Sequence, residues 1–259
     1  MRPEHKDEMK SRKRNIRLTV AYDGTNYHGF QRQKPPVVAV QNVLEARLEK
    51  VFGDTIELAA SGRTDAGVHA YGQVVNFFTD GSIPVDRIPR AVNGLLPSDI
   101  VVVDAVEEGP EFSARHSARS KTYLYRIRQG KIPDPFLRNY AWQIAMPLDL
   151  AAMEKALSCL LGTHDFTSFR ASGGAPMSPV RTLYRAEMEC REQGLLETWI
   201  HGNGFLYHMV RNIMGTLVNV GLGRISPEGF QRILEAKDRR KASPTAPAQG
   251  LYLYSVEYP

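Results

Sequence analysis

The sequence has few cysteines and no long apolar run. Cys159 and Cys190 are its two cysteines, and they lie outside any Cys-x-x-Cys or Cys/His cluster. This spacing suggests neither a disulfide framework nor a structural zinc site. No apolar run approaches the roughly 18 to 20 residues that span a bilayer, and the first residues lack the apolar stretch of a secretory signal. We therefore expect a cytoplasmic protein that does not contact membranes.

Common catalytic motifs are also missing. The sequence contains no GxxxxGK[ST] phosphate loop, no GxSxG elbow, no HExxH and no EF-hand loop. These absences argue against the classes of nucleotide-dependent and metal-dependent enzymes.

Positive charge is in excess and is unevenly spread. The formal net charge is +5 and the isoelectric point is near 9.2. Basic residues gather in three places, which are the segment with Arg12, Lys13, Arg14 and Arg17, the run Arg115, Arg119, Lys121, Arg126 and Arg128, and KDRRK at 237–241. Such clusters suit a nucleic-acid partner, but by themselves they are explained more simply as ordinary solvated surface.

Hydrophobic periodicity predicts the same order of elements in each half of the chain. Alternation predicts strands, apolar spacing of three and four predicts helices, and Gly53 ends the first helix. The first half reads as strands at 16–22, 55–60, 73–79 and 100–107, with helices at 40–52 and 84–95. The second half reads as strands at 119–128, 182–192, 195–201 and 251–258, with helices at 149–161, 205–221 and 226–236. Asp149 and Ser226 are the expected helix caps, and Gln193 and Gly194 the expected hairpin turn.

Each half therefore reads as a split βαββαβ unit. The predicted fold class is α+β, with two such ferredoxin-like units whose sheets form a central cleft. We expect a disordered basic tail at 1–14, an N-terminal domain at 15–108 and a C-terminal domain at 109–259.

The stretch SGRTDAGVHA at 61–70 lies between two predicted strands of the first half. Its serine, glycines and aspartate are good turn formers, so a structural turn is one interpretation. The other is a reactive loop, because Arg63 favours an ionised Asp65, and an ionised aspartate can act as a nucleophile. From spacing alone both interpretations stay open.

Several ordered blocks resemble one known family. They are YDGTNYHGFQRQ at 22–33, SGRTDAGVHA followed by GQVVNF, NGLLPSDIVV at 93–102, FSARHSARSKTYLYRI at 112–127, GTHDFTSF at 162–169, FLYHMVRNIMGTLVNVGLG at 205–223 and GLYLYSVEY at 250–258. With them the chain resembles the tRNA pseudouridine synthase A family. Phe30 departs from the tryptophan more usual in that family.

The resemblance implies isomerisation of uridine to pseudouridine at positions 38, 39 and 40 of the tRNA anticodon stem-loop. It implies that neither a cofactor nor a metal ion is used and that the protein is a homodimer. Matched by motif, Asp65 is the nucleophile, Tyr123 lies beside the target uracil, and Arg211 pairs with Asp65. Arg63 helps to hold the RNA.

A buried nucleophilic carboxylate needs a cation beside it. An arginine at about 4 Å contributes roughly 4 kcal/mol at an effective dielectric of 20, which offsets most of the cost of burial. On the predicted helix 205–221 the apolar stripe leaves His208, Arg211 and Asn212 off the core face. A surface salt bridge is the alternative role of Arg211.

Tyr123 and Tyr125 share one face of a predicted strand with Arg119 and Lys121. Cations and rings on one face suit phosphate contact and stacking on an extruded base, so Arg115, Arg119 and Lys121 are expected to contact RNA. Core packing of the two rings is the alternative.

Two other functions remain to be weighed. A nucleoside or glycoside hydrolase would need a second carboxylate near Asp65, and the local sequence offers none. A non-catalytic RNA-binding module fits the basic runs but leaves the 61–70 motif without a purpose.

Overall fold

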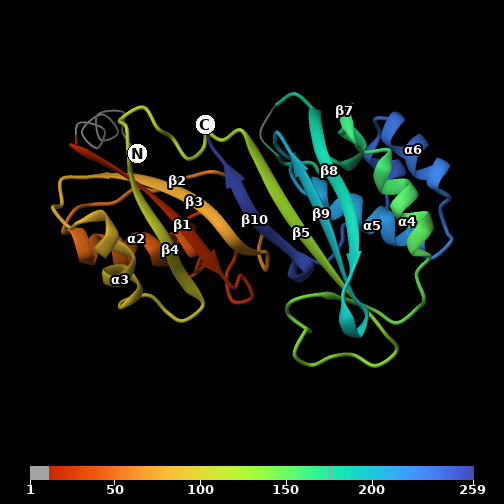
Figure 1. Cartoon of the computed structure of the whole chain (residues 1–259), viewed down its shortest axis with the longest axis horizontal. Coiled ribbons are helices and arrows are strands. Elements are labelled where there is room, and N and C mark those ends of the chain that lie inside the picture. Colours follow the sequence, from red (N-terminus) through yellow and green to blue (C-terminus); the bar gives the residue numbers. More distant parts are fainter. Residues whose placement is uncertain (1–11, 175–176) are drawn as a thin grey trace. The chain divides into compact units, whose positions relative to one another are not determined.

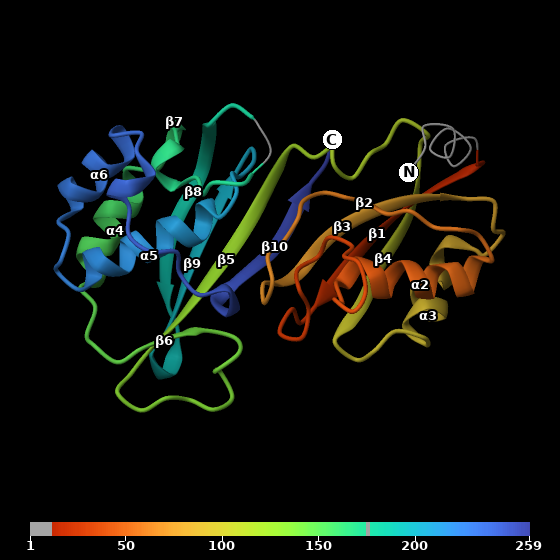
Figure 2. The ribbon, with the colours of Figure 1, turned by 180° about the vertical axis from the view of Figure 1, so that it is seen from behind.

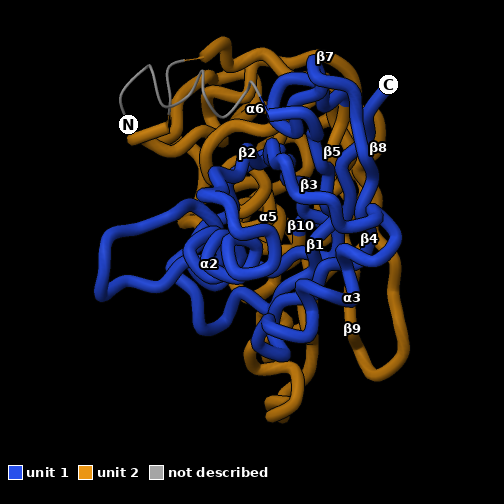
Figure 3. The backbone as a smooth tube through the Cα atoms, turned by 90° about the vertical axis from the view of Figure 1, so that its left-hand side faces the viewer, with its two compact units in different colours: residues 1–119, 253–259 blue, residues 120–252 orange. Residues whose placement is uncertain are grey.

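The chain forms a mixed α+β fold in which most strands are antiparallel. A computed structural model describes residues 12–174 and 177–259. The chain divides into two compact units, one made of residues 1–119 and 253–259 and the other of residues 120–252, as Figure 3 shows by colour. The last strand, β10 (Leu251–Glu257), contributes residues to both units.

The first unit is built on an antiparallel sheet with the strand order β4-β1-β3-β2. Its strands are β1 (Arg14–Tyr22), β2 (Ala59–Ala60), β3 (His69–Thr79) and β4 (Ile100–Glu108). Helices α2 (Val40–Phe52) and α3 (Ile88–Asn93) lie together beside this sheet (Figure 2). The elements of this unit therefore follow the predicted order of strand, helix, strand, strand, helix, strand.

Alternation in β1 produces the core of this unit. Ile16, Leu18 and Val20 are fully buried, whereas the residues between them are partly exposed. The predicted helix at 40–52 is present with its predicted end, because Gly53 adopts the left-handed conformation at φ 74° and its amide closes the last turn on the Glu49 carbonyl.

Two predicted elements of the first unit differ from the structure. The strand expected at 55–60 is reduced to Ala59–Ala60, because the amides of Ile56 and Leu58 donate to the carboxylates of Glu49 and Glu45 on α2 rather than to a strand. The helix expected at 84–95 is divided into a 3-10 turn at Val85–Arg87 followed by α3.

The second unit contains a sheet with the order β5-β9-β8-β7 and three helices that cluster beside it (Figure 1). Its strands are β5 (Ser120–Gln129), β6 (Trp142–Ile144), β7 (Gly162–Asp165), β8 (Val180–Cys190) and β9 (Leu195–Gly202), and its helices are α4 (Leu150–Ser158), α5 (Met209–Gly221) and α6 (Pro227–Glu235). The short strands β6 and β7 were not predicted. Strand β6 pairs with β5 in parallel, and the strand pairs β5–β9, β8–β9 and β7–β8 are antiparallel.

The predicted caps and turn of the second unit are present. The Asp149 carboxylate accepts from the Ala152 amide, and the Ser226 hydroxyl accepts from the Gly229 amide. Gln193 and Gly194 both have positive φ angles, 57° and 71°, as a tight turn between right-twisted strands requires.

Helix α5 begins four residues later than the predicted 205–221. His208 has a φ of 58°, a left-handed conformation that cannot continue a helix, so the helix starts at Met209. The prediction that Asn212 lies off the core face is wrong. Asn212 is fully buried because its side-chain amide donates to the Phe169 carbonyl and accepts from the Thr245 hydroxyl.

The compact units divide after Arg119, whereas the sequence suggested a boundary between residues 108 and 109. The segment after β4 stays with the first unit because Asn15 donates to the carbonyls of Gly109 and Phe112, and Tyr258 donates to that of Ala114. Most of the expected tail, residues 1–11, lies outside the described residues. Arg14 already belongs to β1. No helix in the described part of the chain is long and apolar enough to cross a membrane.

Candidate active site

Residues 61–68 form the loop that connects β2 to β3 in the first unit, and its first part is tied to β3. The Ser61 amide donates to the Val74 carbonyl, and the Ser61 hydroxyl donates to the Gln73 side chain at 2.8 Å. The Gln73 amide in turn donates to the Gly62 carbonyl at 3.0 Å. Ser61 and Gln73 are both buried, so these bonds are shielded from water.

The loop is held on both sides of Asp65. On one side the Phe30 amide donates to the Thr64 carbonyl at 3.1 Å, and the hydroxyls of Tyr22 and Thr64 are 2.7 Å apart. On the other side the Gly67 amide donates to the Tyr27 carbonyl at 3.3 Å. The main chain at Asp65 is thus fixed through its neighbours.

Asp65 itself closes a turn, since its carbonyl accepts from the Val68 amide at 3.1 Å. The turn interpretation and the reactive-loop interpretation are therefore compatible. The Asp65 side chain is half-buried, and Arg63 is exposed.

Two glycines of the 22–33 segment allow the main chain to approach this loop closely. A Cβ at Gly24 would lie 2.0 Å from the Val68 carbonyl oxygen. A Cβ at Gly29 would lie 2.7 Å from the Thr64 carbonyl oxygen and 3.3 Å from the Asp65 carbonyl carbon. Gly29 also has a φ of 84°, which favours glycine. No larger residue fits at either position without moving the loop.

His69 is buried, at 2 % exposed, and links the loop to the same segment. Its Nδ1 lies 3.1 Å from the Gly24 amide nitrogen and 3.1 Å from an Asp23 carboxylate oxygen. This nitrogen thus lies against both Asp23 and Gly24 of the 22–33 segment. His69 therefore has a structural part in the loop.

Arg211 lies in the first turn of α5 in the second unit. Its Nε donates to the Ala246 carbonyl at 2.8 Å, and the Ala246 amide donates back to the Arg211 carbonyl at 3.0 Å. Its Nη1 lies 3.5 Å from Nε2 of His208. Gly215, one turn further along, permits this approach, since a Cβ there would lie 2.0 Å from the Pro244 carbonyl oxygen. The 244–247 loop thus sets the direction of the guanidinium group.

The two tyrosines of β5 have different surroundings. Tyr123 is half-buried, and its ring meets that of Phe205 edge to face with centroids 4.9 Å apart. Tyr125 is fully buried and donates to the Pro247 carbonyl at 2.8 Å. Burial raises the pKa of the Tyr125 hydroxyl, against a smaller opposing effect of the Arg211 charge. For Tyr125, core packing is the correct interpretation, and Tyr123 is the more accessible ring.

Of the residues expected to contact RNA, Arg115 and Arg119 are exposed and Lys121 is half-buried.

Most charged side chains of the KDRRK cluster at 237–241 contact other residues of the protein. Arg239 donates to the Asn212 side chain at 3.0 Å, Arg240 pairs with Asp238 at 2.8 Å, and Lys237 lies 3.8 Å from Asp165.

The expected site residues are divided between the two units. Asp65, Arg63, Arg115 and Arg119 belong to the first unit, and Lys121, Tyr123 and Arg211 belong to the second. Within residues 12–174 and 177–259, no group of three or more His, Cys, Asp and Glu side chains is arranged to hold a metal ion.

The match to a family model covers most of the chain. The model is described as tRNA pseudouridine synthase and matches residues 18–117 and 156–259, which include the 61–70 loop and α5. The chain belongs to the tRNA pseudouridine synthase family. It is accordingly an isomerase that converts uridine to pseudouridine in tRNA.

Relatives agree over nearly the full length. The chain is 49% identical to tRNA pseudouridine synthase A of Thermoanaerobacter sp. (strain X514), covering 95% of this chain and 100% of the relative. It is 48% identical to tRNA pseudouridine synthase A of Geobacillus sp. (strain WCH70), covering 95% and 98%. Among solved structures, an archaeal box H/ACA sRNP Nop10–Cbf5 complex aligns with a TM-score of 0.33 at 14% identity. The alignment covers 76% of this chain and 45% of that chain. At this TM-score the similarity supports no inference.

Proposed function

We propose that the chain modifies positions 38, 39 and 40 of the tRNA anticodon stem-loop and that Asp65 is its nucleophile. The observation that carries the proposal is the loop at 61–68, which holds a half-buried carboxylate on a main chain fixed from both sides. Fixed placement of a nucleophile lowers the entropy cost of reaching the transition state.

In the proposed reaction the Asp65 carboxylate attacks either the uracil ring or the anomeric carbon of the ribose. The bond between N1 of uracil and C1′ of ribose breaks, the uracil turns, and C5 forms a new bond to C1′. C5 loses its proton, N1 gains one, and Asp65 is released unchanged. The product is an isomer of the substrate, so the overall balance needs no external oxidant, reductant or cofactor.

Arg211 is proposed as the cation that pairs with Asp65. Its bond to the Ala246 carbonyl supports this role, because a guanidinium group held in one direction loses little entropy when it binds a carboxylate. Such a pair at about 4 Å contributes roughly 4 kcal/mol at an effective dielectric of 20.

Tyr123 is proposed to lie beside the target uracil. A uridine in a stem must leave the stack at a cost of a few kcal/mol, and a tyrosine ring recovers about 1 to 3 kcal/mol of this by stacking. The edge-to-face contact with Phe205 supports the role, because it restricts the ring of Tyr123 in advance.

The remaining expectations form part of the same proposal. Arg63, Arg115, Arg119 and Lys121 contact RNA phosphates, and two copies of the chain form a homodimer in the cytoplasm. Two split βαββαβ units, whose sheets line a central cleft, provide the binding surface. The antiparallel order β4-β1-β3-β2 in the first unit supports that fold class.

The test is to incubate the purified chain with a tRNA transcript labelled in uridine and to map the modified nucleosides. The proposal expects pseudouridine at positions 38 to 40. Free uracil would indicate a hydrolase, and unchanged RNA would indicate a non-catalytic RNA-binding module.

Asp65→Asn tests the nucleophile. The substitution preserves size and removes the charge, so we expect tRNA binding within about threefold of the unaltered chain and turnover reduced by at least about 10⁴-fold, as for loss of a covalent nucleophile. Turnover near the unaltered rate would assign the nucleophile elsewhere.

A further inference from the structure

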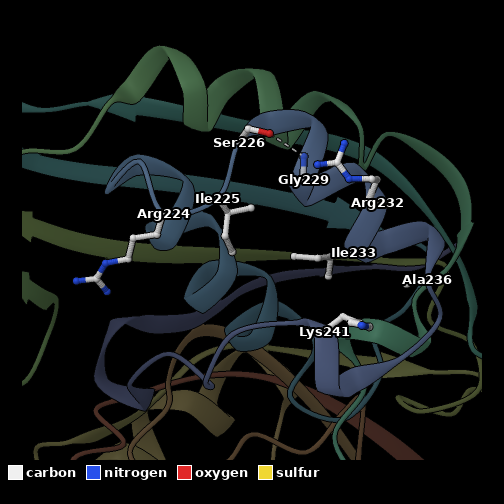
Figure 4. Close-up of a pocket in the computed structure, with 8 residues that line it drawn as sticks. All are labelled: Arg224, Ile225, Ser226, Gly229, Arg232, Ile233, Ala236 and Lys241. Carbon is white, nitrogen blue, oxygen red and sulfur yellow. Dashed lines mark hydrogen bonds between the residues drawn. The ribbon is translucent and has the colours of Figure 1, made fainter.

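The segment between α6 and β10 returns to the first half of α5. Its Lys241 lines a hollow beside α6 (Figure 4). Further along, the Thr245 hydroxyl donates to the Asn212 side chain on α5 at 2.6 Å. The loop at 244–247 is therefore tied to the helix that carries Arg211.

Two hydrogen bonds join Arg211 to Ala246 in this loop. The Ala246 carbonyl accepts from the guanidinium Nε at 2.8 Å, and the Ala246 amide donates to the Arg211 main-chain carbonyl at 3.0 Å. The next residue, Pro247, has a φ of −54°, and its ring prevents rotation about that bond. Pro247 cannot turn about that bond relative to the Ala246 carbonyl, so a restraint on Pro247 also restrains that carbonyl.

Tyr125 on β5 supplies such a restraint. Its hydroxyl donates to the Pro247 carbonyl at 2.8 Å, and the side chain is fully buried. The ring has little room to move. A Cβ at Gly250 would lie 2.7 Å from its Cζ, and the Trp142 ring meets it edge to face with centroids 6.4 Å apart. Burial raises the pKa of Tyr125, so the hydroxyl keeps the proton that it donates.

We propose that Tyr125 is a positioning residue that acts through Arg211. Its hydroxyl holds the Pro247 carbonyl, and the proline ring passes this restraint to the Ala246 carbonyl. That carbonyl in turn directs the Arg211 guanidinium group. Tyr125 itself does not touch the reacting atoms. The inference rests on the proposed function, in which Arg211 is the cation beside Asp65.

The experiment compares Tyr125→Phe with the matched control Tyr252→Phe. Tyr252 is also a buried tyrosine of the second unit, at 4 % exposed, and its hydroxyl donates to the Tyr140 carbonyl at 2.7 Å. Each variant removes one hydroxyl from one main-chain carbonyl, but only Tyr125→Phe releases the loop that binds Arg211. For both variants kcat and KM are measured on tRNA, and denaturant unfolding gives the folded fraction, so that kcat is expressed per folded molecule.

For Tyr125→Phe we expect kcat to fall about tenfold and KM to stay within about twofold, because the guanidinium group is displaced while its charge remains. For Tyr252→Phe we expect kcat and KM within about twofold of the unaltered chain. A purely structural role of Tyr125 predicts the same kcat per folded molecule in both variants, and that result would overturn the inference.

A second measurement combines Tyr125→Phe with Arg211→Lys. If Tyr125 acts through the guanidinium group, its hydroxyl has nothing to direct in the Arg211→Lys chain. The added substitution should then lower kcat by less than about twofold. A further tenfold loss would overturn the inference, because Tyr125 would then affect the reaction by another route.

The single variant Arg211→Lys separates the two ways in which the argument can fail. A normal kcat in that variant would remove Arg211 from the reaction, so the proposed function of Arg211 and the inference would fail together. A reduced kcat in that variant, combined with equal kcat values for Tyr125→Phe and Tyr252→Phe, would overturn the inference alone.

Discussion

The two units hold their expected site residues in different ways. In the first unit, Asp65 is placed by the main chain, because the amides of Phe30 and Gly67 and the close approach at Gly29 fix the loop on both sides of it. In the second unit, Arg211 starts from a regular helix, and its own side chain is directed by the Ala246 carbonyl. The nucleophile candidate depends on the backbone, and the cation candidate depends on side-chain bonds.

This difference suits the chemistry proposed for each residue. An aspartate side chain is short, so a displacement of the main chain moves the carboxylate by a similar distance. The longer arginine side chain can compensate for a small displacement by changing its torsion angles. We therefore expect the loop of the first unit not to tolerate added side-chain volume. At the Arg211 site we expect the loss of activity to depend on how many of the side-chain hydrogen bonds of Arg211 are removed.

The largest expected effect is that of Gly29→Ala. The new methyl group would lie 2.7 Å from the Thr64 carbonyl oxygen at a φ of 84°, so the loop must move. We expect a loss of roughly 3 kcal/mol in the free energy of unfolding, combining left-handed strain with overpacking, and at least a 100-fold loss in kcat/KM. Denaturant unfolding and turnover assays measure the two effects.

Gly53→Ala is the matched control for this substitution. Gly53 also has a positive φ, 74°, but no atom lies within 4 Å of its added methyl group. We expect a cost of only about 1 kcal/mol and unchanged kcat. If the two variants lost activity to the same extent, left-handed strain rather than contact with the loop would be the cause, and the comparison between the units would lose its basis.

The second-largest expected loss of activity is that of Arg211→Lys. Lysine keeps the positive charge but lacks the planar group that binds the Ala246 carbonyl through Nε. We expect kcat to fall by about 10²- to 10³-fold, the range for losing one electrostatic partner of a reacting group, with KM changed by less than about threefold. Unfolding free energy should change by about 1 kcal/mol. A variant with normal kcat would assign Arg211 a structural role.

The sequence predicted the elements whose signals are local. Alternation located β1, the spacing of Val40 and Leu44 located α2, and Asp149 and Ser226 were correctly identified as caps. It failed where distant contacts decide the structure. The strand expected at 55–60 is mostly absent because its amides bind side chains of α2, and Asn212 is buried because Phe169 and Thr245 satisfy its polar atoms.

The same distinction applies to the candidate site. The motif at 61–70 identified the loop and Asp65, but the spacing did not reveal that Gly24 and Gly29, about forty residues earlier in the chain, hold it. The two glycines in the 22–33 block were the available signal, since glycine in a predicted loop often marks a close backbone approach. The hydrophobic periodicity of the sequence gives no information about the residue against which each glycine packs.

The smallest expected effect is that of Tyr22→Phe, which removes one buried hydrogen bond beside the loop without adding volume. The hydroxyls of Tyr22 and Thr64 are 2.7 Å apart, and the substitution leaves the Thr64 hydroxyl without this partner. We expect a cost of about 1 to 2 kcal/mol in unfolding free energy and activity within about threefold. Because the substitution leaves the backbone contacts of Phe30 and Gly29 in place, a large loss of activity would show that side-chain bonds also control the first unit.

The pH dependence of this variant provides an internal check. Burial raises the pKa of Tyr22 from 10.0 to about 12, so the folded chain keeps a proton that the unfolded chain loses above pH 10. The contribution of this hydroxyl to stability is therefore complete below pH 10 and is lost as the pH rises toward 12. Phenylalanine has no such loss, so the difference in unfolding free energy between the unaltered chain and the variant should narrow between about pH 10 and 12. A constant difference across this range, measured by denaturant unfolding, would mean that the Tyr22 hydroxyl is not held in the buried contact with Thr64 that supports the loop.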